Sequence, residues 1–330
     1  MPSEKAQYLV LQIFSVTFPF FALVLCGYVA ARRGFLPLEA IAGLNGFVLF
    51  FALPCMLFRF GATTPIAQLL DVGVFLIWLV CAIVMVAFTI AMSLNRRIRW
   101  NDASFGALVA AFPNTGFMGV PLLVTLLGVQ VAGPMIVTIV VDMLITTSLC
   151  IALSRLDSAG THGMAVAARS ALKSILFNPM PWAILLGGVV SYASLDLPSP
   201  LVKTVWLLAD AASPTALFTI GTVMARSQIL AARNNHDRIP LRDYLPVALF
   251  KLLLHPCLVL LVGTSAMRLG LALEQTSLVV MVLVAALPSA SNVSMLAERY
   301  GADNGRIARI ILASTAAAFL SFSAAVALMV

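Results

Sequence analysis

The chain has 330 residues, of which 62% are hydrophobic and only 10% are charged, and its mean hydropathy is +1.05. A water-soluble domain carries about 25% charged residues, so this composition excludes both one large soluble domain and two smaller ones. The formal net charge of +7 comes from short basic clusters between apolar runs, where lipid headgroups lie, and not from a nucleic-acid-binding surface. The bilayer is therefore the main solvent, and we expect no nucleic-acid partner.

Ten apolar segments separated by charged or Gly/Pro-rich connectors predict an all-α integral membrane protein. Each segment is long enough to cross a hydrocarbon layer of about 30 Å as a helix. The first is longer than the apolar core of a signal peptide and follows no basic stretch, so we expect it to be retained. The predicted spans are 8–31, 38–60, 70–94, 102–127, 131–155, 178–194, 199–226, 243–269, 275–298 and 303–329.

The basic residues predict one orientation. If the amino terminus is extracytoplasmic, fifteen of the twenty lie in cytoplasmic connectors, and only Lys5, Arg59, Lys203 and Arg268 lie on the other side. Positive residues favour the cytoplasmic side, so both termini should be extracytoplasmic, in the cell (inner) membrane. The fifteen are Arg32, Arg33, Arg96, Arg97, Arg99, Arg155, Arg169, Lys173, Arg226, Arg233, Arg238, Arg242, Arg299, Arg306 and Arg309.

Short matches between the halves predict an internal repeat. The run from Gly27 to Pro37 matches that from Gly188 to Pro198, Pro54 matches Pro214, and Pro113 matches Pro288. Since each half holds five spans, an odd number, the second copy must cross the membrane in the opposite sense. We therefore expect a first five-helix repeat at 1–155, a cytoplasmic connector at 156–177 and an inverted second repeat at 178–330.

The fourth and ninth spans should be broken helices. The run FPNTGFMGVP contains Pro113, and LPSASNVS contains Pro288. Proline removes a backbone donor and clashes with the preceding turn, and freed backbone groups cannot face lipid. If the two breaks cross at mid-membrane, the positive amino ends of the half-helices suit a carboxylate.

Uncharged polar side chains flank both breaks. We therefore predict a substrate site, and an alternative is that Asn114 and Asn292 only cap the restarted half-helices. Ser289 is a further hydroxyl donor at the second break. The predicted site residues are Pro113, Asn114, Thr115, Pro288, Ser291 and Asn292.

Four ionisable side chains lie inside predicted spans, where such residues are rare and usually functional. Asp142 is a candidate coupling group, because an isolated carboxylate in the membrane tends to take up a proton, or it pairs with Lys251. Lys251 shares a helix face with His255 and serves as a counter-charge or reaches to the interface. His255 shuttles protons or is a packing residue. For Asp210 we favour a structural role at the backbone donors freed by Pro214.

Enzymatic chemistry has little support. The sequence has no Gly-rich phosphate loop, no HExxH motif and no serine triad in a water-accessible domain. The five cysteines lie in apolar runs without the spacing of a metal site or a disulfide framework. We therefore predict no catalytic residues, no metal site and no cofactor, with proton or sodium coupling left open.

These motifs resemble the auxin efflux carrier family, which includes plant PIN auxin exporters and bacterial permeases for malonate and similar acids. The resemblance rests on PNTGFMGVPL, KLLLHP and LPSASNVSMLAERYG, supported by ALPCMLF and ADAASPTALFTIG, and covers nearly the whole chain. It implies a bile acid symporter-like fold, with a scaffold from helices 1, 2, 6 and 7 and a transport domain from helices 3–5 and 8–10. It also implies substrate binding where helices 4 and 9 cross, elevator-like movement and a homodimer.

The connector from Arg155 to Lys173 is short, unlike the long regulated loop of many plant exporters. The resemblance to the malonate-permease branch implies a short mono- or dicarboxylate such as malonate as substrate. The function predicted is therefore secondary active transport of a small organic anion. Alternatives are a membrane ligand sensor that uses the same pocket, an exporter of auxin-like aromatic carboxylates, and a channel.

Overall fold

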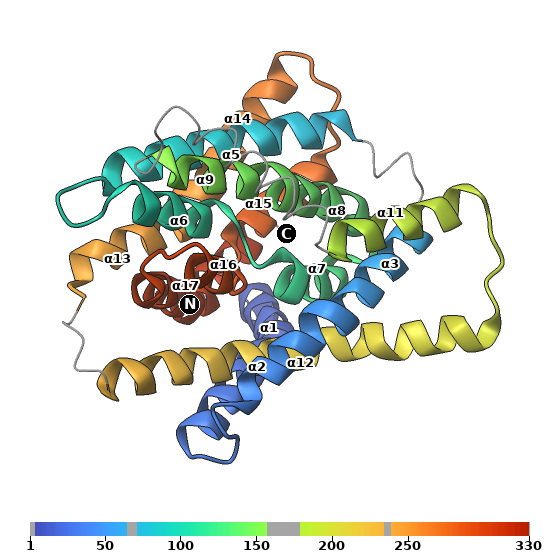
Figure 1. Cartoon of the computed structure of the whole chain (residues 1–330). Coiled ribbons are helices and arrows are strands. Elements are labelled where there is room, and N and C mark those ends of the chain that lie inside the picture. The colour runs from blue at the N-terminus through green and yellow to red at the C-terminus, as the bar shows by residue number, and fades with distance from the viewer. Residues whose placement is uncertain (1–3, 65–70, 157–178, 234–238, 330) are drawn as a thin grey trace.

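The computed structural model describes residues 4–64, 71–156, 179–233 and 239–329, and within these ranges the chain is helical without a β-strand (Figure 1). The prediction of an all-α membrane protein is confirmed at this level. The α-helices of the first half are α1 (Glu4–Arg32), α2 (Ala40–Phe47), α3 (Leu53–Thr63), α5 (Val72–Ser93), α6 (Trp100–Ala111), α7 (Val120–Leu127), α8 (Ala132–Val140) and α9 (Thr147–Ser154). Those of the second half are α11 (Pro179–Tyr192), α12 (Ser199–Arg233), α13 (Leu241–Leu249), α14 (His255–Arg268), α15 (Gln275–Ala286), α16 (Val293–Arg299) and α17 (Asn304–Met329).

Short turns of other helix types join several of these helices into longer rods. Four are π-helical and one is a 3-10 turn, and π-helical turns inside α-helices often mark functional positions. The π-helical turns are η1 (Val48–Ala52), η2 (Thr115–Gly119), η4 (Val141–Thr146) and η6 (Phe250–Leu254), and the 3-10 turn is η3 (Val129–Val131).

Six helical segments of the described chain are long and apolar enough to cross a membrane. Four shorter apolar helices fall within the other predicted spans. The six long segments are Ala40–Thr63, Val72–Ser93, Ala132–Ser154, Ser199–Arg226, Leu241–Arg268 and Asn304–Met329, and the four shorter ones are Phe18–Arg32, Thr115–Leu127, Trp182–Tyr192 and Gln275–Ala286.

The helix α12 extends well beyond its predicted span. The prediction ended the seventh span at 226, but α12 continues to Arg233 because no glycine or proline follows Arg226 in this stretch. It also passes through Pro214 as one helix. The predicted connector 156–177 lies, apart from residue 156, outside the described residues, as do Arg169, Lys173 and Arg238.

The helices pack in two groups. In Figure 1, α12 runs along one side of the molecule with α1, α2 and α3 against it, and α11 packs against α3. The second group contains α5, α6, α9, α13, α14, α15 and α17, which pack mainly on one another.

Glycines set the closest approaches within the first group. A methyl group added at Gly27 of α1 would collide with the Phe218 carbonyl of α12, and one added at Gly221 of α12 would collide with the Val24 carbonyl of α1. Between α3 and α11, Gly61 and Gly187 make the same kind of mutual contact. Small residues allow helix backbones in a membrane to pack directly, where no hydrophobic force drives them together.

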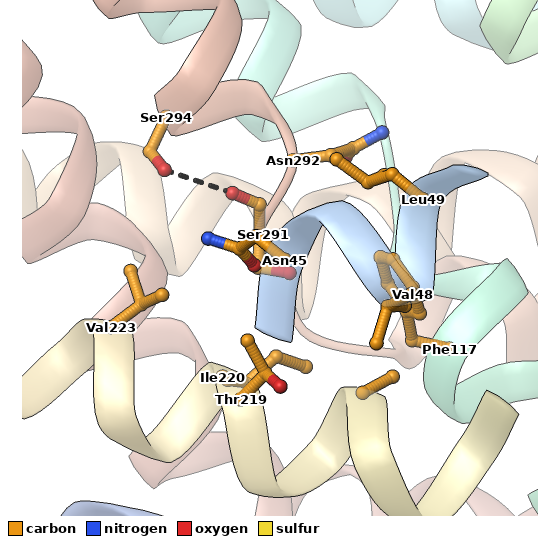
Figure 2. A pocket seen from close by; sticks show the side chains of 11 residues that line it. Asn45, Val48, Leu49, Phe117, Thr219, Ile220, Val223, Ser291, Asn292 and Ser294 are labelled. Carbon is orange, nitrogen blue, oxygen red and sulfur yellow. Dashed lines mark hydrogen bonds between the residues drawn. The ribbon is translucent and has the colours of Figure 1, made fainter. Parts of the chain in front are cut away.

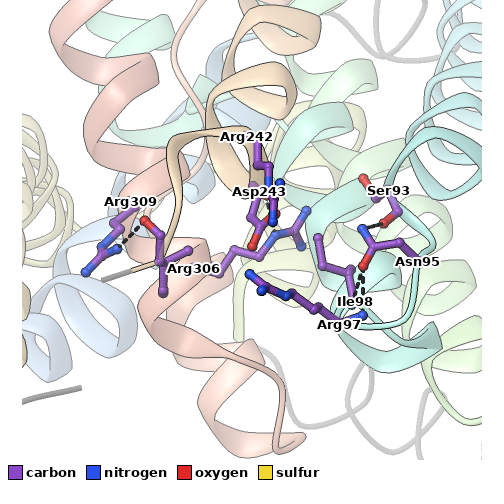
Figure 3. A network of polar contacts seen from close by, with 9 residues as sticks. Ser93, Asn95, Arg97, Ile98, Arg242, Asp243, Arg306 and Arg309 are labelled. Carbon is purple, nitrogen blue, oxygen red and sulfur yellow. Dashed lines mark hydrogen bonds and ion pairs between the residues drawn. The ribbon is translucent and has the colours of Figure 1, made fainter. Parts of the chain in front are cut away.

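Polar contacts join helices at one end of the second group, where Figure 3 shows Arg97, Arg242, Arg306 and Arg309. Arg306 of α17 is buried, and its Nε donates to the Asp243 carbonyl of α13 at 2.7 Å. Its Nη1 donates to the Asp102 carbonyl of α6 at 2.9 Å. Arg309 Nη1 donates to the Ile239 carbonyl at 2.9 Å. Arg306 thus joins the starts of three helices.

We predict that Gly27→Val strongly destabilises the folded protein, because the new side chain must push α12 away from α1. Overpacking of this kind costs about 1–3 kcal/mol and more where backbone must move. The matched control is Gly46→Val, since Gly46 of α2 has open space at its Cβ position. Thermal unfolding of both purified variants in the same detergent checks the prediction. Equal unfolding temperatures would contradict it.

Candidate functional site

Two helices of the second group, α6 and α15, each end in an interruption. The first interruption follows α6, which ends at Ala111, and the chain turns through Pro113 before η2 and α7 resume the helix. The second follows α15, which ends at Ala286, and α16 begins at Val293. Both interruptions contain the proline on which the sequence prediction rested.

The two interruptions pair with each other through backbone hydrogen bonds. The backbone N–H of Asn114 donates to the Pro288 carbonyl at 2.8 Å, and the backbone N–H of Ala290 donates to the Phe112 carbonyl at 3.0 Å. They form an antiparallel bridge of one residue pair, Pro113 with Ser289. The freed backbone groups of one helix are thus satisfied by the other, as the apolar interior of a membrane requires.

The bridge brings the two prolines of the sequence prediction close together. Pro113 pairs with Ser289, the residue that follows Pro288.

Polar atoms without hydrogen-bond partners gather around the bridge. Among the described residues, eleven buried side-chain polar atoms have no hydrogen-bond partner, and three of them, Thr115 Oγ1, Ser289 Oγ and Asn292 Oδ1, belong to the two interruptions. Asn114 is 3% exposed. Neither Asn114 nor Asn292 makes a side-chain capping hydrogen bond, so the alternative in which these two asparagines only cap the half-helices is wrong. Buried polar groups normally find partners, so this cluster is prepared to receive one.

A small cavity of about 20 Å³ lies directly at the bridge. It is walled by α3 and α11 of the first group and by both interruptions. Of the predicted site residues, Pro113, Asn114 and Asn292 line it, and the others are Leu53, Leu57, Phe112, Gly116, Phe117, Ile139, Met143, Met180 and Ala290.

A second cavity of about 20 Å³ lies between α2, η1, α12 and the segment before α16 (Figure 2). Phe117 and Asn292 line both cavities, so the two cavities adjoin at these residues. The predicted Ser291 lines this cavity, whereas Thr115 and Pro288 line neither of the two. The other residues around it are Asn45, Val48, Leu49, Ala216, Thr219, Ile220, Val223 and Ser294.

The sequence prediction missed three polar residues of this second cavity: Asn45, Thr219 and Ser294. Asn45 stands in an AGLNGF run, and a polar amide between two glycines inside an apolar segment was a signal that could have found it. Thr219 gave no such signal, because its hydroxyl bonds to the Thr215 carbonyl of its own helix as many membrane threonines do.

A buried polar cluster lies beside the bridge. Asp142, in η4, is fully buried, and its Oδ1 accepts hydrogen bonds from Trp78 Nε1 and Thr146 Oγ1, both at 3.1 Å. Its Oδ2 has no partner among the described residues. Met143, the next residue, lines the bridge cavity, so η4 borders that cavity. Trp78 was not predicted.

Lys251, in η6, belongs to the same cluster. Its Nζ lies 2.7 Å from the Ala285 carbonyl and 3.0 Å from His255 Nδ1, and the whole side chain is buried. The alternative in which Lys251 reaches to the membrane interface is therefore wrong, because the ammonium finds its partners inside the protein. His255 also packs on Trp78, with ring centroids 5.3 Å apart.

Asp210 has a different role from the one expected. Asp210 Oδ1 lies 2.6 Å from Arg59 Nη1, and the Asp210 side chain is 66% exposed. Arg59 also lies over the Trp206 ring, 5.9 Å from its centroid. The carboxylate is drawn to this guanidinium, so its role is an ion pair between α3 and α12 and not the satisfaction of backbone donors near Pro214.

Helices of membrane-spanning length, two paired interruptions and a buried polar cluster beside them define a multi-pass membrane transport protein. The comparison with family models gives the particular family. Residues 12–326 match the model described as "Membrane transport protein", and the chain belongs to that family. It is the auxin efflux carrier family that the motifs resemble, so that prediction is confirmed.

Relatives of known sequence are similar over most of their length. The chain is 30% identical over 306 residues, 92% of each chain, to a Rhizobium meliloti (strain 1021) protein named "Putative malonate transporter". It is 27% identical over 296 residues, 86% of each chain, to the "Uncharacterized transporter YfdV" of Escherichia coli (strain K12). It is 28% identical over 303 residues, 91% of this chain and 92% of the relative, to an "Uncharacterized transporter" of Methanothermobacter thermautotrophicus. The family and these names indicate a transporter.

We predict that Asp142→Asn destabilises the protein more than the double variant Asp142→Asn with Lys251→Met. The single change leaves a buried ammonium without its opposite charge, which costs about 3–5 kcal/mol, whereas replacing both charges can be nearly neutral. Thermal unfolding of wild type, both single variants and the double variant in one detergent measures the coupling. Strictly additive shifts would show that the two charges do not stabilise each other.

Proposed function

We propose that this protein is a secondary active transporter of a small organic anion, with a short mono- or dicarboxylate such as malonate as the preferred substrate. The observation that carries the proposal is the hydrogen-bonded crossing of the two interruptions, surrounded by buried polar atoms without partners. The family membership supports transport, and the name of the Rhizobium meliloti relative supports malonate.

The substrate carboxylate is bound at the crossing. Asn114 and Asn292 offer amide groups in the wall of the bridge cavity. Thr115, the next residue after Asn114, lies outside the cavity wall, and its unpartnered hydroxyl becomes a donor when the site opens. The helix formed by η2 and α7 begins at Thr115 and presents the positive end of its dipole, which favours an anion. The proposed binding residues are Pro113, Asn114, Thr115, Pro288, Ser291 and Asn292.

Binding requires movement of the helices around the crossing. A cavity of about 20 Å³ holds one or two water molecules and is too small for a dicarboxylate. We propose elevator-like alternating access, in which spans 3–5 and 8–10 (α5 to α9 and α13 to α17) move as a transport domain. The scaffold consists of spans 1, 2, 6 and 7 (α1, α2 with α3, α11 and α12). The packing of α1, α3, α11 and α12 on one another supports this division.

A five-plus-five inverted repeat, with halves at 1–155 and 178–330, accounts for the glycine contacts. Gly27 lies against Phe218, and Gly187 lies against Phe58. Gly187 is 160 positions after Gly27, and Phe218 is 160 positions after Phe58, so the second contact repeats the first with the two halves exchanged. The contacts of Gly221 with Val24 and of Gly61 with Ile184 obey the same offset. A two-fold axis in the membrane plane, as in the bile acid symporter-like fold, produces such exchanged pairs.

Asp142, Lys251 and His255 are the proposed coupling or charge-compensating groups. They are buried together beside the crossing, where an ionisable group is costly unless it serves the transport cycle. We further propose an inner-membrane location, extracytoplasmic termini and a homodimer. The gathering of Arg242, Arg306 and Arg309 at one end supports this orientation.

We predict that Asn292→Ala reduces malonate uptake at least tenfold, because the amide lines both cavities and its Oδ1 is free to meet a partner. Uptake of labelled malonate into proteoliposomes measures it. The matched control is Asn304→Ala, which removes the same amide at the start of α17, outside both cavities.

A thermal-shift series with malonate on the same proteins separates binding from movement, because a ligand that binds the folded state raises the unfolding temperature. Full uptake by Asn292→Ala, or an equal loss in both variants, would contradict the proposed site. A malonate-dependent shift without uptake would favour the sensor.

A further inference from the structure

The carboxyl end of α15 carries a negative partial charge inside the protein. The last four carbonyls of an α-helix have no partner within the helix, and the dipole concentrates negative charge there. α15 ends at Ala286, two residues before Pro288, so this end lies directly beside the crossing. Transporters with broken helices commonly bind a diffusible cation at such ends.

A side-chain ammonium already lies at this place. Lys251 Nζ is 2.7 Å from the Ala285 carbonyl, one residue before the last residue of α15. Its other contact is His255 Nδ1 at 3.0 Å. An ammonium has three donors and the two contacts use two of them. Lys251 therefore coordinates the helix end as a small bound cation would, but from a fixed position on η6.

The charge of this ammonium is balanced within the protein. Asp142, which Trp78 and Thr146 hold by hydrogen bonds, is the nearby acidic side chain whose charge acts on Lys251, although the two make no direct ion-pair contact. The opposite charge reduces the cost of burying the lysine. The half-helix that begins at Thr115 keeps its positive end, whereas Lys251 neutralises the negative end of α15. The crossing is thereby more favourable for an anion.

We infer that Lys251 is an internal cation that takes the place of a diffusible coupling cation at the end of α15, so that the protein folds and transports without bound sodium. The statement about transport rests on the proposed function, whereas the statement about the cation site does not. Shortening Lys251 should expose a hollow lined by the Ala285 carbonyl and His255 Nδ1, the two groups that the ammonium contacts. Methylammonium fits this hollow and replaces the lost group.

The test is thermal unfolding of purified protein at equal ionic strength in choline, sodium or methylammonium chloride. Wild type should unfold at the same temperature in all three. Lys251→Ala should unfold at least about 5 °C lower in choline, and methylammonium should restore at least half of the loss. The matched control is Lys251→Met, whose side chain fills the hollow with apolar atoms, so methylammonium should not restore its stability.

Three results would overturn the inference: stabilisation of wild type by sodium over choline, an unchanged unfolding temperature for Lys251→Ala, or equal rescue of Lys251→Ala and Lys251→Met. If Lys251→Ala does not fold, the comparison of sodium with choline on wild type still decides. Malonate uptake by wild-type proteoliposomes should also be equal in sodium and choline. Absence of any malonate uptake would count against the proposed function, while the unfolding results would still test the cation site.

Discussion

The structure depends on one constraint: backbone that leaves a helix within a membrane must find hydrogen-bond partners in the protein. The two interruptions meet this constraint by pairing with each other, through the Asn114 amide with the Pro288 carbonyl and the Ala290 amide with the Phe112 carbonyl. Because the pairing needs both segments, neither helix can be broken alone. The same pairing brings the polar side chains that follow each proline to one place, which is why a candidate site forms there.

The buried charges belong to this arrangement and are not a separate feature. Lys251 reaches the end of α15 from η6, and Asp142 stands on η4 next to a residue that lines the bridge cavity. Both sit on π-helical turns, which widen a helix locally and alter the direction of its side chains. The π-helical turn η6, which carries Lys251, packs against α6 and α15, the helices that end in the interruptions, and η4 packs against α6. A movement of one of these helices therefore displaces the others.

Much of this could be predicted from the sequence, because apolar length and proline act locally. The helical membrane class and the breaks at Pro113 and Pro288 follow from composition and backbone chemistry alone. Partners across the fold could not be predicted. Nothing local indicates that Trp78 holds Asp142 or that Arg59 takes Asp210, since these contacts depend on how separate helices pack.

The central claim is that the crossing binds the carboxylate. Its most direct test is an experimental structure of the protein with 2-bromomalonate, in which the anomalous signal of bromine locates the ligand without assumptions about its pose. We predict a single strong peak between Asn114 and Asn292, with the helices around the bridge cavity moved apart to make room. A peak elsewhere, for example among Arg242, Arg306 and Arg309, with the crossing unchanged, would contradict the claim.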